Sequence, residues 1–231
     1  MADQYNRSHT MSETITRSEK AYRKLLEAIL ENKLEKGEFI SQRKLAAIAG
    51  TSIVSVREAL KRLEHEYLVE NIPKWGVRIP VETRERIINL YAIREALEVM
   101  AAYMLAGHIE ERDAGLLWEA AEACDLSSTE DAHDLERFSE MHRRFHLQLA
   151  DATKNRILEQ ELERLRVRSL IFQSTKADWY RDLDNPEWWH RHLVEEVLSG
   201  DTDRAQEAMH LHVQHGLRHD LKLFDKENEG G

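Results

Sequence analysis

Histidines are the residues of this sequence whose positions most strongly suggest chemistry. Ten of the 12 follow residue 100, and four lie on apolar stripes of expected helices: His142, His146, His190 and His212. His142 and His146 are four residues apart, so their imidazoles lie about one helical turn apart and suit a single metal ion. Each histidine taken singly is also typical of a hydrogen-bonded core residue. The residues alone leave a metal site and a histidine-rich core both open.

A second group of residues has the chemistry of nucleic-acid contact. It comprises the exposed face expected for a helix at 52–65 and two basic residues of the preceding short helix: Ser52, Ile53, Ser55, Arg57, Lys61, Arg62, Arg43 and Lys44. An arginine at this place can bind guanine through two hydrogen bonds, whereas lysine and serine mostly contact phosphates. Arg57 is therefore the expected base reader. A solvated charged helix face is the alternative.

The elements around these basic residues predict a winged helix-turn-helix over residues 16–80. A first helix ends at Lys36-Gly37, and Ser41 and Ser52 are expected to cap two short helices separated by Gly50. A two-stranded hairpin follows, with Lys74-Trp75-Gly76 at its tip. In such a motif the second short helix enters the major groove of DNA. We place the domain boundary near residues 80–83.

The remainder is expected to be an all-helical antiparallel bundle over residues 83–224. Apolar residues recur at helical spacing in about six segments, and only 9 Gly and 3 Pro interrupt the chain. The predicted fold class is thus mainly α, with an N-terminal winged helix-turn-helix before the bundle. Residues 1–15 are expected to form a disordered tail and residues 225–231 a second tail.

Charge and cysteine usage restrict the class of protein further. The net charge of −10 divides into +3 for residues 1–80 and −13 for the rest, which favours a DNA-binding head on an acidic body. The single cysteine, Cys124, excludes an intramolecular disulfide and favours a cytoplasmic protein. No segment has the roughly 20 apolar residues of a membrane span, and residues 1–15 lack the pattern of a secretory signal.

The head resembles the DNA-binding domain of the GntR family of bacterial transcription factors. The similarity is carried by ISQRKLA at 40–46, GTSIVSVREALKRL at 50–63 and WGV at 75–77. The resemblance implies DNA-contacting roles for Arg43, Arg57 and the wing-tip residue Gly76. Ile53 departs from the family, where arginine is common. An isoleucine can pack on a thymine methyl but donates no hydrogen bond, so the resemblance does not give the operator sequence.

Residues 87–222 resemble the FCD effector-binding domain of the FadR subfamily. The matching features are LYAIREALE at 90–98, Phe145-His146 followed by Asn155, His190 ahead of Gly200-Asp201, and Ala205, Ala208-Met209 and His212. The resemblance implies a divalent metal held by His146, His190 and His212, with His142 where the family carries Asp. Four neutral imidazoles would leave the ion's full charge for an anionic effector and favour Zn²⁺, Ni²⁺, Fe²⁺ or Co²⁺. Arg94 is expected either to clamp the effector carboxylate or to pair with Glu98.

These features predict a transcriptional regulator rather than an enzyme. The expected protein is a homodimeric repressor that binds a two-fold operator on double-stranded DNA and responds to a small organic acid at the metal. Two alternatives stay open. One is a metal-dependent enzyme on a helical bundle, which gives no reason for the winged head, and the other is a direct metal sensor.

Overall fold

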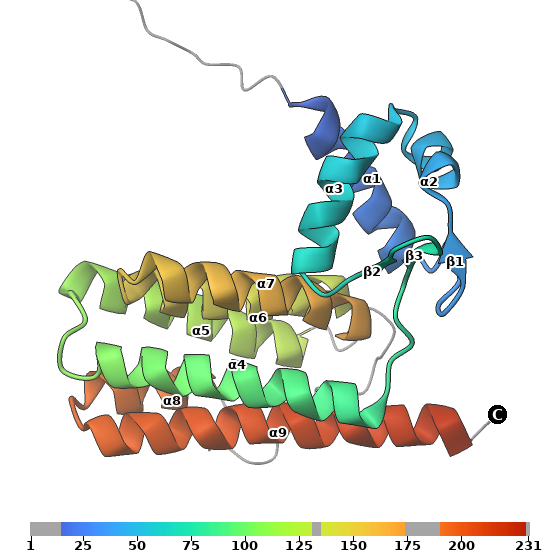
Figure 1. Cartoon of the computed structure of the whole chain (residues 1–231). Coiled ribbons are helices and arrows are strands. Elements are labelled where there is room, and N and C mark those ends of the chain that lie inside the picture. The colour runs from blue at the N-terminus through green and yellow to red at the C-terminus, as the bar shows by residue number, and fades with distance from the viewer. Residues whose placement is uncertain (1–14, 131–134, 174–189, 230–231) are drawn as a thin grey trace, which may run out of the picture.

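The structure is a computed structural model that describes residues 15–130, 135–173 and 190–229. Figure 1 shows a head of three helices and a small sheet, standing over one end of a body of long helices. The predicted fold class is confirmed, because a winged helix-turn-helix precedes a helical bundle.

Three short helices of the head begin where small hydroxyl side chains cap them. They are α1 (Arg17–Leu30), α2 (Gln42–Ala49) and α3 (Ile53–His65). Thr16, Ser41 and Ser52 each accept a hydrogen bond from the backbone N–H three residues later, which satisfies a donor that the first turn leaves without a partner. Gly50 ends α2 in the left-handed conformation, with φ of 62°.

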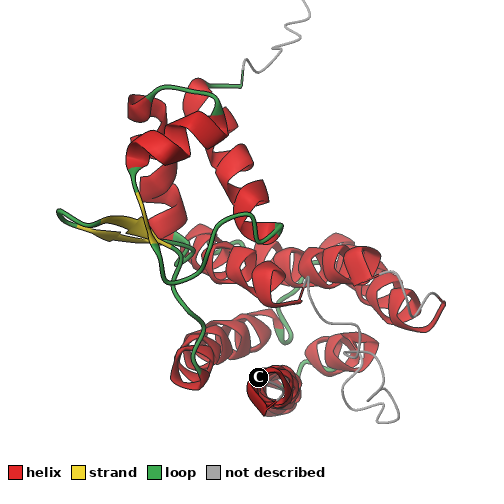
Figure 2. Cartoon of the chain, turned by 90° about the vertical axis from the view of Figure 1, so that its right-hand side faces the viewer, coloured by secondary structure: helices red, strands yellow, loops and turns green. Residues whose placement is uncertain are grey.

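The wing has three strands rather than the predicted two. β2 (Glu70–Ile72) and β3 (Gly76–Arg78) form the expected antiparallel hairpin, and β1 (Phe39–Ile40) pairs with the other edge of β3. The segment after α1 lies beside β3 because Gly37 N–H donates to the Ile79 carbonyl at 2.8 Å. In Figure 2 the hairpin projects away from the helices of the head.

Six helices form the body in the described residues. They are α4 (Arg84–Leu105), α5 (Glu111–Glu130), α6 (Leu135–Ala152), α7 (Arg156–Gln173), α8 (His190–Leu198) and α9 (Thr202–Glu229). α4 packs along α9, and α5 packs along α6. The expectation of a C-terminal tail from residue 225 is wrong for residues 225–229, because α9 continues to Glu229. Neither Gly nor Pro occurs among these residues. None of the described helices is long and apolar enough to cross a membrane.

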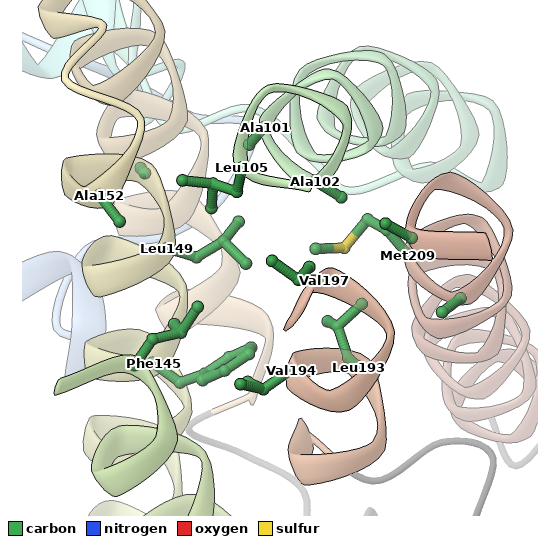
Figure 3. Packing of buried hydrophobic residues seen from close by; sticks show 14 of the residues in the cluster. Ala101, Ala102, Leu105, Phe145, Leu149, Ala152, Leu193, Val194, Val197 and Met209 are labelled. Atoms are coloured by element: carbon green, nitrogen blue, oxygen red, sulfur yellow. The ribbon is translucent and has the colours of Figure 1, made fainter. Parts of the chain in front are cut away.

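The head and the body have separate hydrophobic cores. The core of the head is built from residues between Ala21 and Ile79, and that of the body from residues between Ile87 and Val213. Figure 3 shows the centre of the body core, where Phe145 and Leu149 of α6 meet Leu193 and Val197 of α8. α8 packs mainly against α5 and α9, and α6 against α5, and this packing positions the histidines that α6 and α8 carry.

Candidate metal centre and DNA-binding surface

Four buried histidines converge from three helices of the body. His142 and His146 lie on α6, His190 begins α8, and His212 lies on α9. Each offers one ring nitrogen, and these four atoms all lie within 4.8 Å of one another. His146 Nε2 is 3.1 Å from His142 Nε2 and 3.2 Å from His212 Nε2. The structure thus brings together all four histidines predicted as metal ligands.

The spacing and the type of these donors fit a metal ion. Zinc–imidazole bonds of about 2.0–2.1 Å at tetrahedral angles separate the nitrogens by about 3.3 Å. Two of the Nε2 separations, 3.1 and 3.2 Å, are close to that value. Imidazole donors without thiolate or carboxylate suit Zn²⁺, Ni²⁺, Fe²⁺ or Co²⁺ better than Mg²⁺ or Ca²⁺. The cluster is therefore a chemically suitable site for a borderline divalent metal.

Two buried carboxylates lie beside imidazoles of the cluster. Asp125 Oδ1 is hydrogen-bonded to His190 Nδ1 at 2.9 Å, and Glu98 Oε2 is 3.4 Å from His146 Nδ1. A proton on His190 Nδ1 leaves its Nε2 lone pair facing the cluster, which is the form that binds metals. Burial disfavours the charged Asp125, but His190 outweighs this effect and lowers the pKa of Asp125. Sequence patterns did not single out Asp125.

Arg94 pairs with Glu98 and also reaches the histidine cluster. Its Nε donates to Glu98 Oε1 at 3.1 Å, and its Nη2 lies 3.4 Å from His146 Nε2. Burial alone would lower the pKa of Arg94, yet the adjacent Glu98 carboxylate raises it above its ordinary value, so the guanidinium stays charged. The structure is compatible with both roles expected of Arg94, because its Nε pairs with Glu98 and its Nη2 faces the histidine cluster.

Cys124 lies beside the same cluster, which its sequence position did not indicate. Its Sγ is 3.6 Å from His190 Nε2, and burial raises the pKa of the thiol well above its ordinary value. His219, which lies outside the cluster on α9, is also buried, at 6% exposure, because α9 packs against α4.

The head presents most of the predicted DNA-contacting residues to solvent. Arg43, Lys44, Ser52, Ile53, Arg57 and Lys61 are exposed. Arg57 Nε donates to Gln42 Oε1 at 2.9 Å, which fixes its stem between α2 and α3. Lys61 pairs with Glu58. Arg62 lies over the Tyr22 ring and pairs with Glu66, so it helps hold the head together.

Two residues that were predicted to contact DNA have a structural role within the head. Ser55 is only 9% exposed, because it faces the core of the head and its Oγ lies 3.0 Å from Ser52 Oγ. The expectation that Ser55 is exposed is wrong. Gly76, with φ of 109°, begins β3, and a Cβ there would lie 3.0 Å from the Ile40 carbonyl oxygen. Its lack of a side chain thus serves the pairing of β1 with β3, while Trp75 beside it is 70% exposed.

Comparison with known proteins assigns both parts of the chain. Residues 17–79 match the bacterial regulatory proteins of the gntR family, and residues 89–215, more than half of the chain, match the FCD domain. Relatives include the uncharacterized HTH-type transcriptional regulator YdhC of Bacillus subtilis, 26% identical over 210 residues that cover 90% of this chain and 92% of YdhC. The HTH-type transcriptional repressor GlaR of Escherichia coli is 28% identical over 200 residues, covering 80% of this chain and 89% of GlaR.

Solved structures share the same fold. Escherichia coli McbR/YncC superposes with a TM-score of 0.65 at 20% identity, covering 91% of this chain and 99% of that one. With a winged head of the gntR type and a helical FCD body, the chain is a DNA-binding transcriptional regulator that belongs to the GntR family.

Proposed function

We propose that this regulator is a metal-containing repressor whose affinity for its operator changes when a small organic acid binds in the body. The observation that carries the proposal is the buried four-histidine cluster inside the FCD domain. GlaR, which is similar over most of its length, bears the name of a repressor. Since a bacterial chromosome lies in the cytoplasm, the proposal also places the chain there.

The DNA-binding part of the proposal assigns the operator contacts to one face of the head. Arg57 reads a base in the major groove from α3, and Arg43, Lys44, Ser52 and Lys61 hold the phosphate backbone. Ile53, which is 38% exposed, packs on a thymine methyl. A homodimer presents two such heads, so the operator has two half-sites about one turn of DNA apart.

The sensing part assigns the metal to His142, His146, His190 and His212. A bound divalent ion supplies a Lewis-acidic positive centre that attracts a carboxylate. Arg94 binds the same carboxylate through the guanidinium end that lies 3.4 Å from His146 Nε2. The full chain carries net charge −10, so an anion is attracted to this buried centre and not to the surface as a whole.

Release from DNA follows if the effector changes the placement of the two heads. Half-sites at a fixed separation are bound together only when the two recognition helices have the matching separation. A ligand that prefers one head placement shifts the population toward it. The organic acid therefore acts on operator affinity without touching the DNA-binding residues.

Two variants measured side by side test both halves of this function. Arg57→Ala is expected to lower operator affinity by about 1–3 kcal/mol because a base contact is lost, and to keep its metal. His146→Ala is expected to lose bound metal and to keep its basal DNA affinity. The measurements are gel-shift titration on duplexes that the wild-type protein selects from a random library, and elemental analysis of the purified proteins.

Each variant is the control for the other. Wild-type DNA affinity in Arg57→Ala would refute the assignment of the recognition face. Wild-type metal content in His146→Ala would refute the metal centre. If Zn²⁺ alone, without any organic acid, switches the operator affinity of the wild-type protein, the ion itself is the signal and the effector part of the proposal fails.

A further inference from the structure

One arginine of the body binds the end of the recognition helix. Arg86, in the first turn of α4, donates from Nη2 to the carbonyl oxygen of Tyr67 at 2.8 Å. Its Nη1 also lies 3.7 Å from Glu70 Oε1 on β2. Tyr67 follows Glu66, the residue that caps α3. A charged hydrogen bond thus joins the first helix of the effector domain to the residue that directly follows the cap of the recognition helix.

The local backbone makes this contact well defined. Tyr67 has a φ of 59°, in the left-handed region, and the N–H groups of Tyr67 and Leu68 close the end of α3 by bonding to the carbonyls of Glu64 and Leu63. The carboxyl end of a helix carries a partial negative charge, so a cation there is favourable. On the other side of the contact, Thr83 Oγ1 accepts from the backbone N–H of Arg86 at 3.2 Å, which fixes the start of the arginine stem.

Around this contact the head and the body do not share a core. Their hydrophobic clusters have no residue in common. A cleft of about 580 Å³ lies beside the contact, with Gly37 and Arg78 on the head side and Asn89 and Ile93 on α4. α1 also touches α7. With open volume at the junction, the angle between head and body depends on a few specific contacts rather than on a packed interface.

We propose that Arg86 is a positioning residue that sets the direction of the recognition helix relative to the effector domain. α3 has 13 residues and is therefore about 20 Å long. A tilt of about 10° around the end that Arg86 holds moves the DNA-reading end by about 3.5 Å, which is about one base-pair step. A tilt of this size is enough to misplace α3 on its half-site.

The same helix connects this contact to the metal centre. Arg94 and Glu98 lie about two and three turns further along α4 and contact the histidine cluster. Shifts of about 1–2 Å in a packed helix are common in regulatory transitions. A shift of α4 caused by ligand binding reaches α3 through Arg86. This last step rests on the proposed function, whereas the positioning role of Arg86 does not.

A distance measurement on the full chain tests the positioning role directly. Spin labels at Val54→Cys on α3 and Ile157→Cys on α7 report the head-to-body distance, since both positions are exposed and the native Cys124 is buried. Diluting the labelled chain with unlabelled protein removes distances between copies. Arg86→Met, which keeps the apolar stem, is expected to broaden the distribution and shift it by several ångströms, the lever displacement derived above.

Arg84→Met is the matched control. Arg84 lies in the same turn of α4, but its partner is Asp225 on α9, at 3.5 Å, so this ion pair joins two helices of the body and does not reach the head. This variant is expected to give the wild-type distribution, and both variants should keep the wild-type melting temperature and metal content. An unchanged, narrow distribution in folded Arg86→Met overturns the proposal, as does an equal broadening in Arg84→Met.

A second measurement uses DNA and separates this inference from the proposed function. On selected two-fold duplexes with the half-sites moved by two base pairs, the wild-type protein and Arg84→Met are expected to bind about tenfold more weakly than on the original spacing. Arg86→Met is expected to lose most of this preference. If the wild-type protein shows no preference, the two-fold operator is wrong, and the distance measurement still decides the role of Arg86.

Discussion

Asp125 is the residue that most firmly fixes a predicted metal ligand. Its Oδ1 accepts from the His190 backbone N–H at 3.1 Å and contacts His190 Nδ1, while Oδ2 accepts from Arg191 Nε at 3.0 Å. One carboxylate therefore begins helix α8 and also orients the His190 ring. Such partners of metal-bound imidazoles raise ligand basicity and hold the ring in the binding orientation.

Asp125→Asn is expected to lower metal affinity by about 10–100-fold, because a neutral amide polarises His190 less and can present an N–H instead of an acceptor. Competition with a chromophoric chelator for Zn²⁺ measures the change. Asp151→Asn is the control, since Asp151 is an exposed aspartate on α6. Equal Zn²⁺ affinity in Asp125→Asn and the control would show that Asp125 serves only to start α8.

The wing shows how an element depends on one backbone position. Strand order β1-β3-β2 places β3 in the middle, and a Cβ added at Gly76, the first residue of β3, would lie 3.0 Å from the Ile40 carbonyl oxygen. A left-handed φ together with the short approach to backbone leaves little space for a side chain there. Glycine at this position is thus required by the sheet itself, before any contact with DNA.

Gly76→Ala is expected to destabilise the head by about 1–3 kcal/mol, because alanine disfavours this φ and its Cβ meets the Ile40 carbonyl at 3.0 Å. Gly115→Ala is the control within α5, where an added Cβ meets nothing within 4 Å. That variant is expected to stabilise the body by about 0.5–1 kcal/mol. Urea unfolding measures both changes, and equal effects of the two substitutions would contradict the assigned role of Gly76.

The whole molecule consists of two cores joined through α4 and a few polar contacts. The head is slightly basic and the body strongly acidic, at +3 for residues 1–80 and −13 for the remainder. Repulsion between the body and DNA confines binding to the head, and the cations of that face make binding sensitive to salt. The proposed metal site lies within the body, since all four histidines lie on α6, α8 and α9.

Calorimetry of the full chain is expected to give two unfolding transitions, because the two cores share no residue. Zn²⁺ at about 1,000 times its dissociation constant should stabilise the body by about 4 kcal/mol and leave the transition of the head in place. The metal-depleted protein and Gly76→Ala identify which transition belongs to which part. A single transition that moves as a whole with Zn²⁺ would show that the two cores unfold together.

Local features of the sequence were sufficient for most of the elements and for the residue types of the site. Ser41, Gly50 and Ser52 mark the ends of the head helices because capping and left-handed backbone depend on neighbouring residues alone. Helical spacing likewise indicated that His142 and His146 face inward, as they do. The continuation of α9 to Glu229 was missed because charged residues without Gly or Pro are equally compatible with helix and tail.

Only the tertiary structure decided which inward faces meet. Spacing along a helix fixes the side on which a residue lies but not the helix that covers that side. The sequence therefore did not indicate that the Nε2 atoms of His146 and His212, which are 66 residues apart, lie 3.2 Å from each other. For the same reason the sequence did not indicate that Asp125 contacts His190 or that Arg86 binds at the end of α3. It also did not indicate that Ser55 and His219 are buried. The sequence by itself determined a GntR-like head, a helical body and four candidate ligands. Packing decided how they are joined, because contacts between distant segments depend on how the helices cross.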